Sequence, residues 1–519
     1  MTKSIADDEP PSVALAPDVE AWLRAGAGAS AKGCEKVIET SISWIFLYPD
    51  RALKLKKPVD LVILDFTTPD KRRWASQREL TFNAPGAPDI YRRVRAITRA
   101  ASGTLSFDGP GEVVEWALEM RRFDDTAVLL NRLSQVDGAF AETLGRRIAA
   151  FHATAAVGAV GGGAPGLGYI LASNARLLRH LASHLGKAAV ERLIATTDAA
   201  FTELSPLLDR RMEQGFVRCC HGDLHLGNIL LEAGQPILFD CIEFNDRLRE
   251  IDILYDVGFL LMDLAFRGAP EAANRVLNGW LDQAARTFSA GPWEGLAALG
   301  LYQSVRAAVR AHVNGMEGRH DESRRYLAAA QAHLEPGVPA LIALGGLSGS
   351  GKSTLARALA PRLGAAPGAV VLRSDEIRKR LWGRDPTAAL PPEAYAPQAS
   401  VSVYEALFSA ARACLAAGKT VVADAVFLRP EERAGVEALA AASGAAFHGL
   451  WLEAPPEILR HRIESRRGDA SDADARVLAL QLTRDPGDIR WPRRADANTP
   501  EGLARVWRDL AGQDRRAPT

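Results

Sequence analysis

The sequence has few of the features that mark secreted, zinc-binding or membrane-spanning proteins. It has 5 cysteines in 519 residues and no C-x-x-C pair, which favours reduced, mostly buried thiols in a cytoplasmic protein over a disulfide framework or a zinc site. No run of 18 or more apolar residues predicts a membrane span, and residues 1–11 lack the apolar core of a signal peptide. The 63 Lys and Arg residues balance 63 Asp and Glu residues, so net charge predicts no bulk attraction to nucleic acid or membranes.

One complete phosphate-binding motif, G-x-x-x-x-G-K-[ST], occupies residues 346–353. An apolar run at 340–344 precedes it and a helix-forming run at 355–359 follows it, which is the strand, loop and helix context that the motif requires. The glycines allow backbone N–H groups to face an anion, Lys352 can reach the β/γ-phosphates, and the Ser353 hydroxyl can hold Mg²⁺. The predicted nucleotide-binding residues are Gly346, Ser348, Gly349, Ser350, Gly351, Lys352, Ser353 and Thr354.

A second group of polar residues lies in an otherwise helical region, at 218–244. A loop, strand, turn and strand pattern there is expected to bring Asp223, Asn228 and Asp240 close together. Their side-chain oxygens suit Mg²⁺ and phosphate chemistry. From spacing alone, the alternative is that Asp223 and Asn228 form turns and Asp240 caps a strand.

The stretch H-G-D-L-H-L-G-N at 221–228 resembles the catalytic loop of aminoglycoside phosphotransferase-like kinases, and residues 237–240 resemble their metal-binding segment. The resemblance covers roughly residues 20–335 and implies a bilobal kinase fold. It implies that Asp223 orients and deprotonates an acceptor hydroxyl, and that Asn228 and Asp240 bind Mg²⁺.

The same resemblance gives supporting roles to neighbouring residues. It implies that His221 braces the loop and that Asp256 is the buried helix aspartate that supports it. We interpret His225 as a packed loop histidine.

A nucleotide-binding lysine is also implied, within residues 52–56. Lys54 fits the A-x-K spacing and is preferred, while Lys56 projects to the same face and is the alternative. Glu79, on a helix predicted over 71–83, is the expected ion-pair partner. Because the preceding hairpin at 39–44 has no glycine, we expect hydroxyl-bearing residues to cover the phosphates, with the adenine held by backbone groups at 118–121.

The chain changes character after the prolines and glycine at 336–339. Strands alternate with helices from that point, which predicts a doubly wound parallel sheet. The expected strands are 340–344, 369–373, 420–423 and 446–452.

Charged residues follow these strands where α/β proteins bind ligands. Asp375 and Arg378 share a face of the first helical turn after one strand, an arrangement that suits a base beside a holder of an anionic substrate. Asp424 ends another strand, where it either positions metal or water or merely terminates the strand. Arg462 and Arg466, four residues apart, are positioned as a lid over the phosphates. The alternatives are that Asp375 is only an N-cap and that the two arginines form a solvated helix face.

This second set resembles the P-loop kinases around polynucleotide 5′-kinase, zeta toxin and chloramphenicol phosphotransferase, over about residues 340–515. The resemblance implies phosphoryl transfer from ATP to a hydroxyl. Asp375 would be the base and Arg378 the substrate holder, and Lys352, Arg462 and Arg466 would stabilise charge.

The whole chain resembles bacterial proteins described as bifunctional aminoglycoside phosphotransferase-like/ATP-binding proteins. We expect an α/β and α+β protein with a flexible leader at 1–17, a bilobal kinase-like domain at 18–335 that divides near 122, and a P-loop kinase domain at 336–519. The expected function is an ATP-dependent kinase with two nucleotide sites, using ATP and Mg²⁺.

The expected acceptor is a hydroxyl of a small molecule, with a nucleic-acid end less favoured and no membrane partner. Two alternatives are that the second domain is an ATPase switch that regulates the first, and that the first domain is a pseudokinase serving as a binding module. The sequence carries no readable code for the acceptor or for the oligomeric state.

Overall fold

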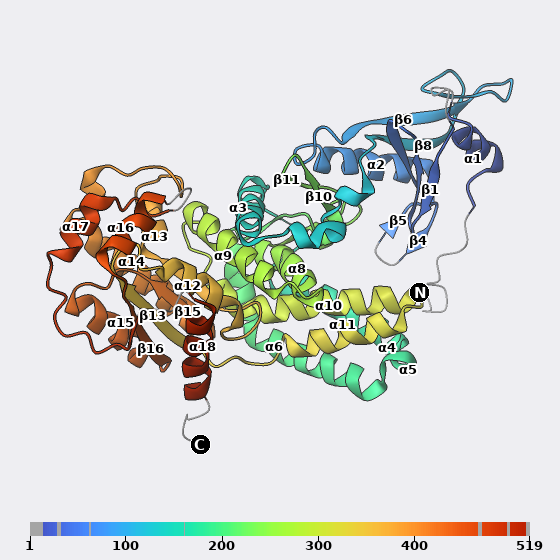
Figure 1. Ribbon diagram of the computed structural model, residues 1–519. Helices are drawn as coiled ribbons and strands as arrows, with labels where there is room; N and C mark the ends of the chain where they lie inside the picture. The colour runs from blue at the N-terminus through green and yellow to red at the C-terminus, as the bar shows by residue number, and fades with distance from the viewer. Residues whose placement is uncertain are drawn as a thin grey trace. The chain divides into compact units, whose positions relative to one another are not determined.

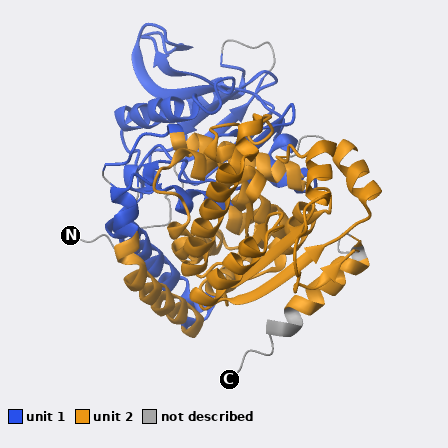
Figure 2. Ribbon diagram, turned by 90° about the vertical axis from the view of Figure 1, so that its left-hand side faces the viewer, with its two compact units in different colours: residues 1–135, 154–187, 208–260 blue, residues 136–153, 188–207, 261–519 orange. Residues whose placement is uncertain are grey.

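Two large sheets, one antiparallel and one parallel, organise the chain in the computed structural model (Figure 1). The structure describes residues 14–27, 33–61, 64–159, 161–465, 470–495 and 499–514. The chain divides into two compact units, which Figure 2 draws in blue and orange. Unit 1 comprises residues 1–135, 154–187 and 208–260, and unit 2 comprises residues 136–153, 188–207 and 261–519.

This division differs from the domain boundary predicted near residue 335. Three helical segments that the sequence assigns to the first domain, at 136–153, 188–207 and 261–335, group with the P-loop domain instead. The predicted domain bounds therefore stay a prediction. Most of the predicted leader, residues 1–13, lies outside the described residues, and helix α1 (Pro17–Arg24) begins at its end.

The sheet of unit 1 has the order β1-β2-β3-β8-β6-β7, and all its neighbouring strands are antiparallel. Its strands are β1 (Lys36–Glu39), β2 (Ser43–Leu47), β3 (Arg51–Lys56), β6 (Tyr91–Arg99), β7 (Leu105–Phe107) and β8 (Glu112–Arg121). Helix α2 (Pro69–Asn83) packs on β8 and β6, and the Thr68 hydroxyl caps its first turn. The hairpin expected at 39–44 joins β1 to β2, and the helix predicted over 71–83 is α2, which begins two residues earlier.

Short elements of unit 1 carry the second predicted site. They are β9 (Val217–Cys219), η4 (Leu226–Asn228), β10 (Ile229–Glu232), β11 (Gln235–Leu238) and β12 (Glu250–Asp252), followed by helix α8 (Ile253–Phe266). Ala233 and Gly234 both have positive φ between β10 and β11, which is typical of a tight hairpin turn. Because β10 and β11 are antiparallel, Asn228, just before β10, and Asp240, just after β11, lie at the same end of this hairpin.

The sheet of unit 2 has the order β14-β15-β13-β16-β17, and its neighbouring strands are parallel. Its strands are β13 (Ala340–Gly346), β14 (Val370–Arg373), β15 (Val421–Asp424), β16 (Ala446–Leu452) and β17 (Arg493–Arg494). All four predicted strands are therefore confirmed, and every residue of the central strand β13 is buried. Its helices after the phosphate loop are α12 (Lys352–Leu359), α13 (Ser374–Leu381), α14 (Pro397–Ala416), α15 (Pro430–Ala442), α16 (Pro456–Ser465), α17 (Ala475–Leu482) and α18 (Pro500–Asp514).

Helices α3 (Gly138–Thr154) and α9 (Pro270–Thr287) also belong largely to unit 2. Helix α9 covers the outer strand β14: the Asn278 side-chain oxygen accepts a hydrogen bond from Val371 N at 2.7 Å, and Asn274 Nδ2 donates to Ala369 O at 3.0 Å. These side chains satisfy backbone groups that an edge strand would otherwise present unpaired. The remaining elements are α4 (Gly163–His180), α5 (Ala182–Leu185), α6 (Lys187–Glu213), α7 (Asp246–Arg249), α10 (Leu299–Met316), α11 (His320–Ala332), β4 (Asp60–Leu61), β5 (Leu64–Asp65), η2 (Asp125–Ala127), η3 (Leu129–Gln135), η5 (Glu294–Ala298), η6 (Ala360–Arg362) and η7 (Pro392–Tyr395).

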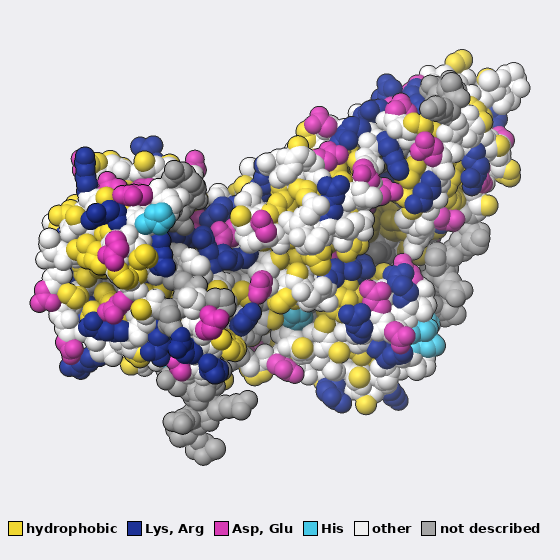
Figure 3. Space-filling view, viewed as in Figure 1, with side chains coloured by type: hydrophobic (Ala, Val, Ile, Leu, Met, Phe, Trp, Pro, Cys, Tyr) yellow, Lys and Arg dark blue, Asp and Glu magenta, His cyan; other side chains and the backbone are white. Residues whose placement is uncertain are grey.

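Charges of both signs are interspersed over the face seen in Figure 3, in keeping with the net charge of zero. Within the described part of the chain, no helix has the length and apolar character needed to cross a membrane. Cys220, Cys241 and Cys414 are buried, and Cys34 and Cys219 are partly buried.

Two candidate active sites

The phosphate-binding loop joins the end of β13 to the start of α12. Gly349 and Gly351 have φ values of +85° and +93°, a region that favours glycine. A Cβ at Gly349 would approach Leu459 O to 2.6 Å, so the neighbouring chain also requires glycine there. Lys352 Nζ donates to Gly346 O at 2.8 Å and to Leu347 O at 3.0 Å, which holds the lysine over its own loop.

Ser353 and Asp424 meet beside this loop. The Ser353 hydroxyl donates to Asp424 Oδ2 at 2.6 Å, and Asp424 is buried at the end of β15. A hydroxyl and a carboxylate oxygen are ligands that Mg²⁺ prefers, so this pair fits the ion that a P-loop nucleotide brings. The geometry supports a metal role for Asp424 over the alternative that it only ends a strand.

Asp375 and Arg378 line the same cavity as Lys352 and Ser353, with a volume of about 430 Å³. Burial raises the pKa of the Asp375 carboxyl; the Arg373 guanidinium opposes the rise and the Asp424 carboxylate adds to it. The Arg378 guanidinium donates to Ala394 O and lies 5.0 Å from the centre of the Tyr395 ring. Asp375 therefore faces the cavity as an acid with a raised pKa, beside an arginine that other groups hold in place.

The predicted lid is described only in part. Arg462, near the end of α16, lines the cavity, and its Nη1 donates to Gly349 O at 3.4 Å. Arg466 lies outside the described residues. Arg462 thus contacts the phosphate loop, and its role as a lid over the phosphates stays a prediction.

The sequence reasoning missed three residues at this site, namely Arg373, Glu376 and Gln481. Arg373 Nη2 donates to the Ser353 hydroxyl at 3.1 Å, and Arg373 Nη1 donates to Glu376 Oε1 at 3.0 Å. Gln481 on α17 accepts from Ser348 N at 2.9 Å and donates to Ser348 Oγ at 3.1 Å. No spacing rule links Gln481 to a serine 133 residues earlier, whereas Arg373 lies two residues before Asp375 and its strand-end position was a usable signal.

The second candidate site, in unit 1, is built on the loop at 221–228. Asn228 Nδ2 donates to both the backbone oxygen and the Oδ2 of Asp223, each at 2.9 Å. The Asp223 side chain is 41% exposed, so its carboxylate is open to an acceptor. Phe239 N donates to Asn228 O at 3.1 Å, which places Asp240 next to the loop and leaves three oxygen-bearing side chains at one end of the hairpin.

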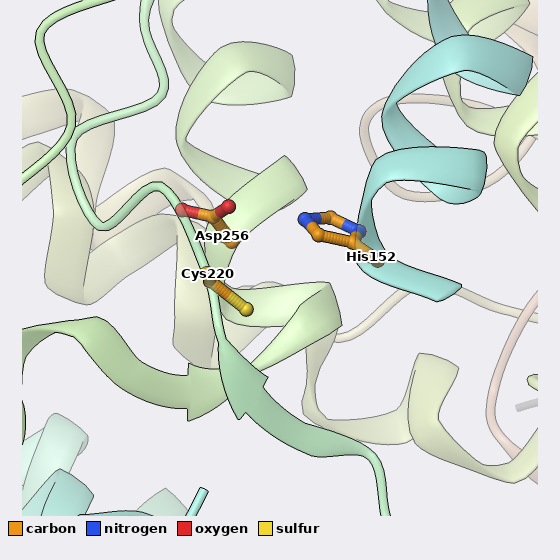
Figure 4. Close-up of side chains that lie close together, drawn as sticks. All are labelled: His152, Cys220 and Asp256. Atoms are coloured by element: carbon orange, nitrogen blue, oxygen red, sulfur yellow. The ribbon is translucent and has the colours of Figure 1, made fainter. Parts of the chain in front are cut away.

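The loop is held from beneath by Asp256 and His221. The two carboxylate oxygens of Asp256 accept from the backbone N–H groups of His221 and Gly222 at 3.1 and 2.9 Å. Figure 4 shows Asp256 on α8 beside Cys220, the residue that precedes this loop. His221 Nε2 lies 2.8 Å from Phe239 O, and its Nδ1 accepts from Asp223 N at 3.3 Å. Burial lowers the pKa of His221, so a neutral ring braces the loop through both nitrogens.

His225 packs against a neighbouring ring, as interpreted from the sequence, and it also makes polar contacts. Its ring lies 5.3 Å from that of Phe259, edge to face, and its Nδ1 accepts from Gly227 N at 3.0 Å. Its Nε2 lies 3.4 Å from Asp223 Oδ2. The histidine therefore also contacts the Asp223 carboxylate.

Lys54 and Lys56 lie in one buried ionic cluster with Glu79. Lys54 Nζ contacts Glu79 at 2.8 Å and Asp240 at 2.7 Å. Lys56 Nζ contacts the other Glu79 oxygen at 2.6 Å and also pairs with Glu243. Both lysines therefore pair with the expected glutamate, but Lys54 contacts the proposed metal ligand and Lys56 does not, which supports the preference for Lys54. Glu243 was missed by the sequence reasoning.

The glycine-free hairpin between β1 and β2 is closed by a hydroxyl. Thr40 Oγ1 accepts from Ser43 N at 3.0 Å, so this threonine shapes the turn itself. A further contact comes from strand β6, where the Tyr91 hydroxyl accepts from Asp240 N at 3.0 Å. Tyr91 is thus another residue that positions Asp240, and the sequence reasoning did not identify it.

The comparisons with known proteins identify the families of the two parts of the chain that carry these sites. The family model described as "Phosphotransferase enzyme family" matches residues 72–294, and the model described as "AAA domain" matches residues 341–484. A phosphotransferase domain followed by a P-loop kinase domain defines the class: this is a kinase-type phosphotransferase, and both the predicted resemblances and the predicted fold class are confirmed.

The chain belongs to one family with the uncharacterized protein Rv2004c of Mycobacterium tuberculosis. The two are 31% identical over 471 residues, which cover 86% of this chain and 89% of that protein. The uncharacterized protein Mb2027c of Mycobacterium bovis matches with the same identity and coverage.

Among solved structures, a glucosamine kinase matches at 17% identity and a TM-score of 0.36, over 61% of this chain and 80% of that one. The APS kinase CysC of Mycobacterium tuberculosis, in complex with AMPPNP and APS, matches at 21% identity and a TM-score of 0.24, over 34% of this chain and 99% of that one. Scores this low carry no argument about the acceptor of this chain.

Proposed function

We propose that this protein is an ATP- and Mg²⁺-dependent kinase with two nucleotide sites, each transferring the γ-phosphoryl group of ATP to a hydroxyl of a small molecule. One observation carries the proposal: the cavity of unit 2 combines Lys352 and the Ser353–Asp424 pair with a partly buried acid, Asp375, that faces the same space. A motor or switch needs the first three groups, but a base beside the phosphates suits transfer to an acceptor.

In the unit 2 site, each side chain acts at a definite point of the transfer. Lys352 and Arg462 face the phosphate loop and stabilise charge on the transferred group, and Ser353 with Asp424 would hold the metal ion. Mg²⁺ held there would supply charge neutralisation to the phosphates. Asp375 receives the proton of the acceptor hydroxyl, and Arg378 holds the acceptor.

In the unit 1 site, Asp223 receives the acceptor proton. Asn228 and Asp240 would hold the metal, Lys54 would contact the nucleotide phosphates, and Glu79 fixes Lys54. The retained set of Asp223, Asn228 and Asp240 supports an active kinase over a pseudokinase. The site restricts the acceptor only by its chemistry, because the acceptor must offer a hydroxyl within reach of the Asp223 carboxylate.

An untargeted screen with labelled ATP tests the proposal. Metabolite mixtures are offered to the wild type and to Lys352→Ala, and labelled products are separated. We expect Lys352→Ala to lose product formed at the unit 2 site by about 10²-fold or more, because a charge-stabilising donor is removed. ATP hydrolysis without any labelled product, across sugars, nucleosides, aminoglycosides and RNA ends, would instead favour the ATPase switch.

The raised pKa of Asp375 gives a pH-dependent prediction. A base must be ionised to accept a proton, so transfer is lost as pH falls through its pKa. We expect the acidic limb of kcat/KM at the unit 2 site to lie above the pH at which an ordinary aspartate, with a pKa of about 3.9, would place it. The profile is measured for wild type and for Asp375→Glu, which retains a carboxyl.

The decisive variant for the base is Asp375→Asn. Transfer that persists in Asp375→Asn, together with loss of transfer in Lys352→Ala, shows that the base assignment is wrong. Binding of an ATP analogue to each variant is the folding control.

A further inference from the structure

The guanidinium of Arg373 lies between the proposed metal ligands and a carboxylate outside them. Arg373 ends strand β14, and its side chain is only 4% exposed. It donates to Ser353 Oγ at 3.1 Å and to Asp424 Oδ2 at 3.4 Å on one side, and to Glu376 Oε1 at 3.0 Å on the other. A buried cation therefore already contacts the two oxygens proposed to hold Mg²⁺.

Glu376 is shared between two arginines. Besides Arg373, its Oε1 lies 3.5 Å from Nη2 of Arg146, which belongs to helix α3. Arg146 Nη2 also lies 3.5 Å from Asp282 on α9. The Glu376 side chain is partly screened from solvent, and the neighbouring guanidinium groups lower its pKa against the effect of burial. Glu376 is thus ionised. When its ion pair with one of the two arginines weakens, its ion pair with the other becomes stronger.

Helices α3 and α9 are attached to the nucleotide site through two more contacts. Arg357, on the helix that follows the phosphate loop, has its Nε 3.0 Å from Glu142 Oε1 on α3. Asn278 on α9 accepts from Val371 N in β14, two residues before Arg373. Both helices lie in the segment that the sequence assigns to the first kinase domain, yet they form part of the same compact unit as the phosphate loop.

We propose that Arg373 is a positioning residue that competes with Mg²⁺ for Asp424 and Ser353, and that Arg146 on α3 sets the strength of this competition through Glu376. The proposal rests on the proposed function, which makes Asp424 and Ser353 the metal ligands. A guanidinium and a divalent cation repel each other strongly in a partly buried site, so binding the metal displaces Arg373 toward Glu376. Arg146 occupies that same carboxylate, and therefore resists the displacement.

The consequence is reciprocal coupling between helix α3 and the metal site. A change in α3 that withdraws Arg146 strengthens the Arg373–Glu376 pair and eases metal binding, and metal binding in turn weakens the hold of Glu376 on Arg146. The helices of the first predicted domain would thereby set the Mg²⁺ requirement of the P-loop kinase.

The test measures metal-dependent nucleotide binding rather than turnover. Full-length protein carries Asp240→Asn as a common background, which removes a proposed metal ligand of the unit 1 site. Binding of a fluorescent, non-hydrolysable ATP analogue is titrated with Mg²⁺. We expect Glu376→Gln to raise the half-saturating Mg²⁺ concentration about fivefold or more, because Arg373 is left with Asp424, and Arg146→Gln to lower it by a similar factor.

Matched variants isolate the effect. Arg146→Lys keeps the charge and should resemble the parent more than Arg146→Gln does. Arg362→Gln, a half-exposed arginine of the same unit, should leave the titration unchanged. In an Arg373→Gln background the effect of Arg146→Gln should vanish, because the competitor through which it acts is gone.

The opposite signs of the two main variants make the outcome decisive. Equal shifts in one direction would mean general loosening of α13 and would overturn the inference, as would a parent-like Arg146→Gln titration or an effect that survives in the Arg373→Gln background. Should Glu376→Gln not fold, the Arg146 and Arg373 variants decide alone. Nucleotide binding without any Mg²⁺ dependence in the parent would instead defeat the proposed metal site, and the inference with it.

Discussion

Asp223→Asn is expected to lower phosphoryl transfer at the unit 1 site by about 10³-fold, while nucleotide binding changes little. The asparagine keeps the size of the side chain and an oxygen that can accept from Asn228 Nδ2, as Asp223 Oδ2 does at 2.9 Å. It cannot accept the acceptor proton. Asn228 Nδ2 also donates to the backbone oxygen of residue 223 at 2.9 Å. This bond does not involve the side chain of residue 223, so the substitution preserves the loop.

The measurement is kcat/KM for an acceptor that Lys352→Ala still phosphorylates, with every variant made in that Lys352→Ala background. Asp89→Asn, an exposed aspartate of the same unit, is the matched control and should retain full activity. Binding of an ATP analogue reports folding of the site. If Asp223→Asn transfers as fast as the control with every acceptor, the unit 1 site is not a kinase and the binding-module alternative gains.

The features predicted from sequence are those whose residues are contiguous. The phosphate loop and the catalytic loop each lie within ten residues, so their chemistry appears as a string, and the comparisons confirm both families. Asp424 is an intermediate case: its strand-end position suggested a ligand or a terminator, and only its 2.6 Å contact with the Ser353 hydroxyl favours the ligand.

The features that the sequence did not reveal are of two kinds. Some depend on residues that lie far apart in the chain, and others are strands whose sequences are rich in charged residues. Strand β6 reads Tyr-Arg-Arg-Val-Arg-Ala-Ile-Thr-Arg, and its four arginines hide the alternation that predicts a strand. The A-x-K spacing favoured Lys54 over Lys56, but the expected ion pair with Glu79 does not separate the two, because both lysines contact that carboxylate. The two differ in a second carboxylate, Asp240 or Glu243, nearly 190 residues later.

The buried ionic cluster also predicts a large effect on stability. Glu79 is fully buried and holds Lys54 at 2.8 Å and Lys56 at 2.6 Å. Burial alone would raise the pKa of Glu79, but the two lysines outweigh it and lower the pKa to about 2. Because the folded pKa lies below the unfolded one, the stabilisation is present above about pH 4.5 and is lost as pH falls toward 2.

We therefore expect Glu79→Gln to destabilise unit 1 by about 3 kcal/mol at neutral pH, since two buried ammonium groups lose a shared counter-charge while each keeps one other carboxylate. For a unit of this size, that corresponds to a fall of roughly 10 °C in the unfolding midpoint. Glu35→Gln, at an exposed position of the same unit, is the matched control. Adding Lys56→Met to Glu79→Gln removes one stranded charge but leaves Glu243 buried without its lysine, so it should recover little. A midpoint equal to that of Glu35→Gln would mean that the favourable charge pairing in the cluster only balances the cost of burying it.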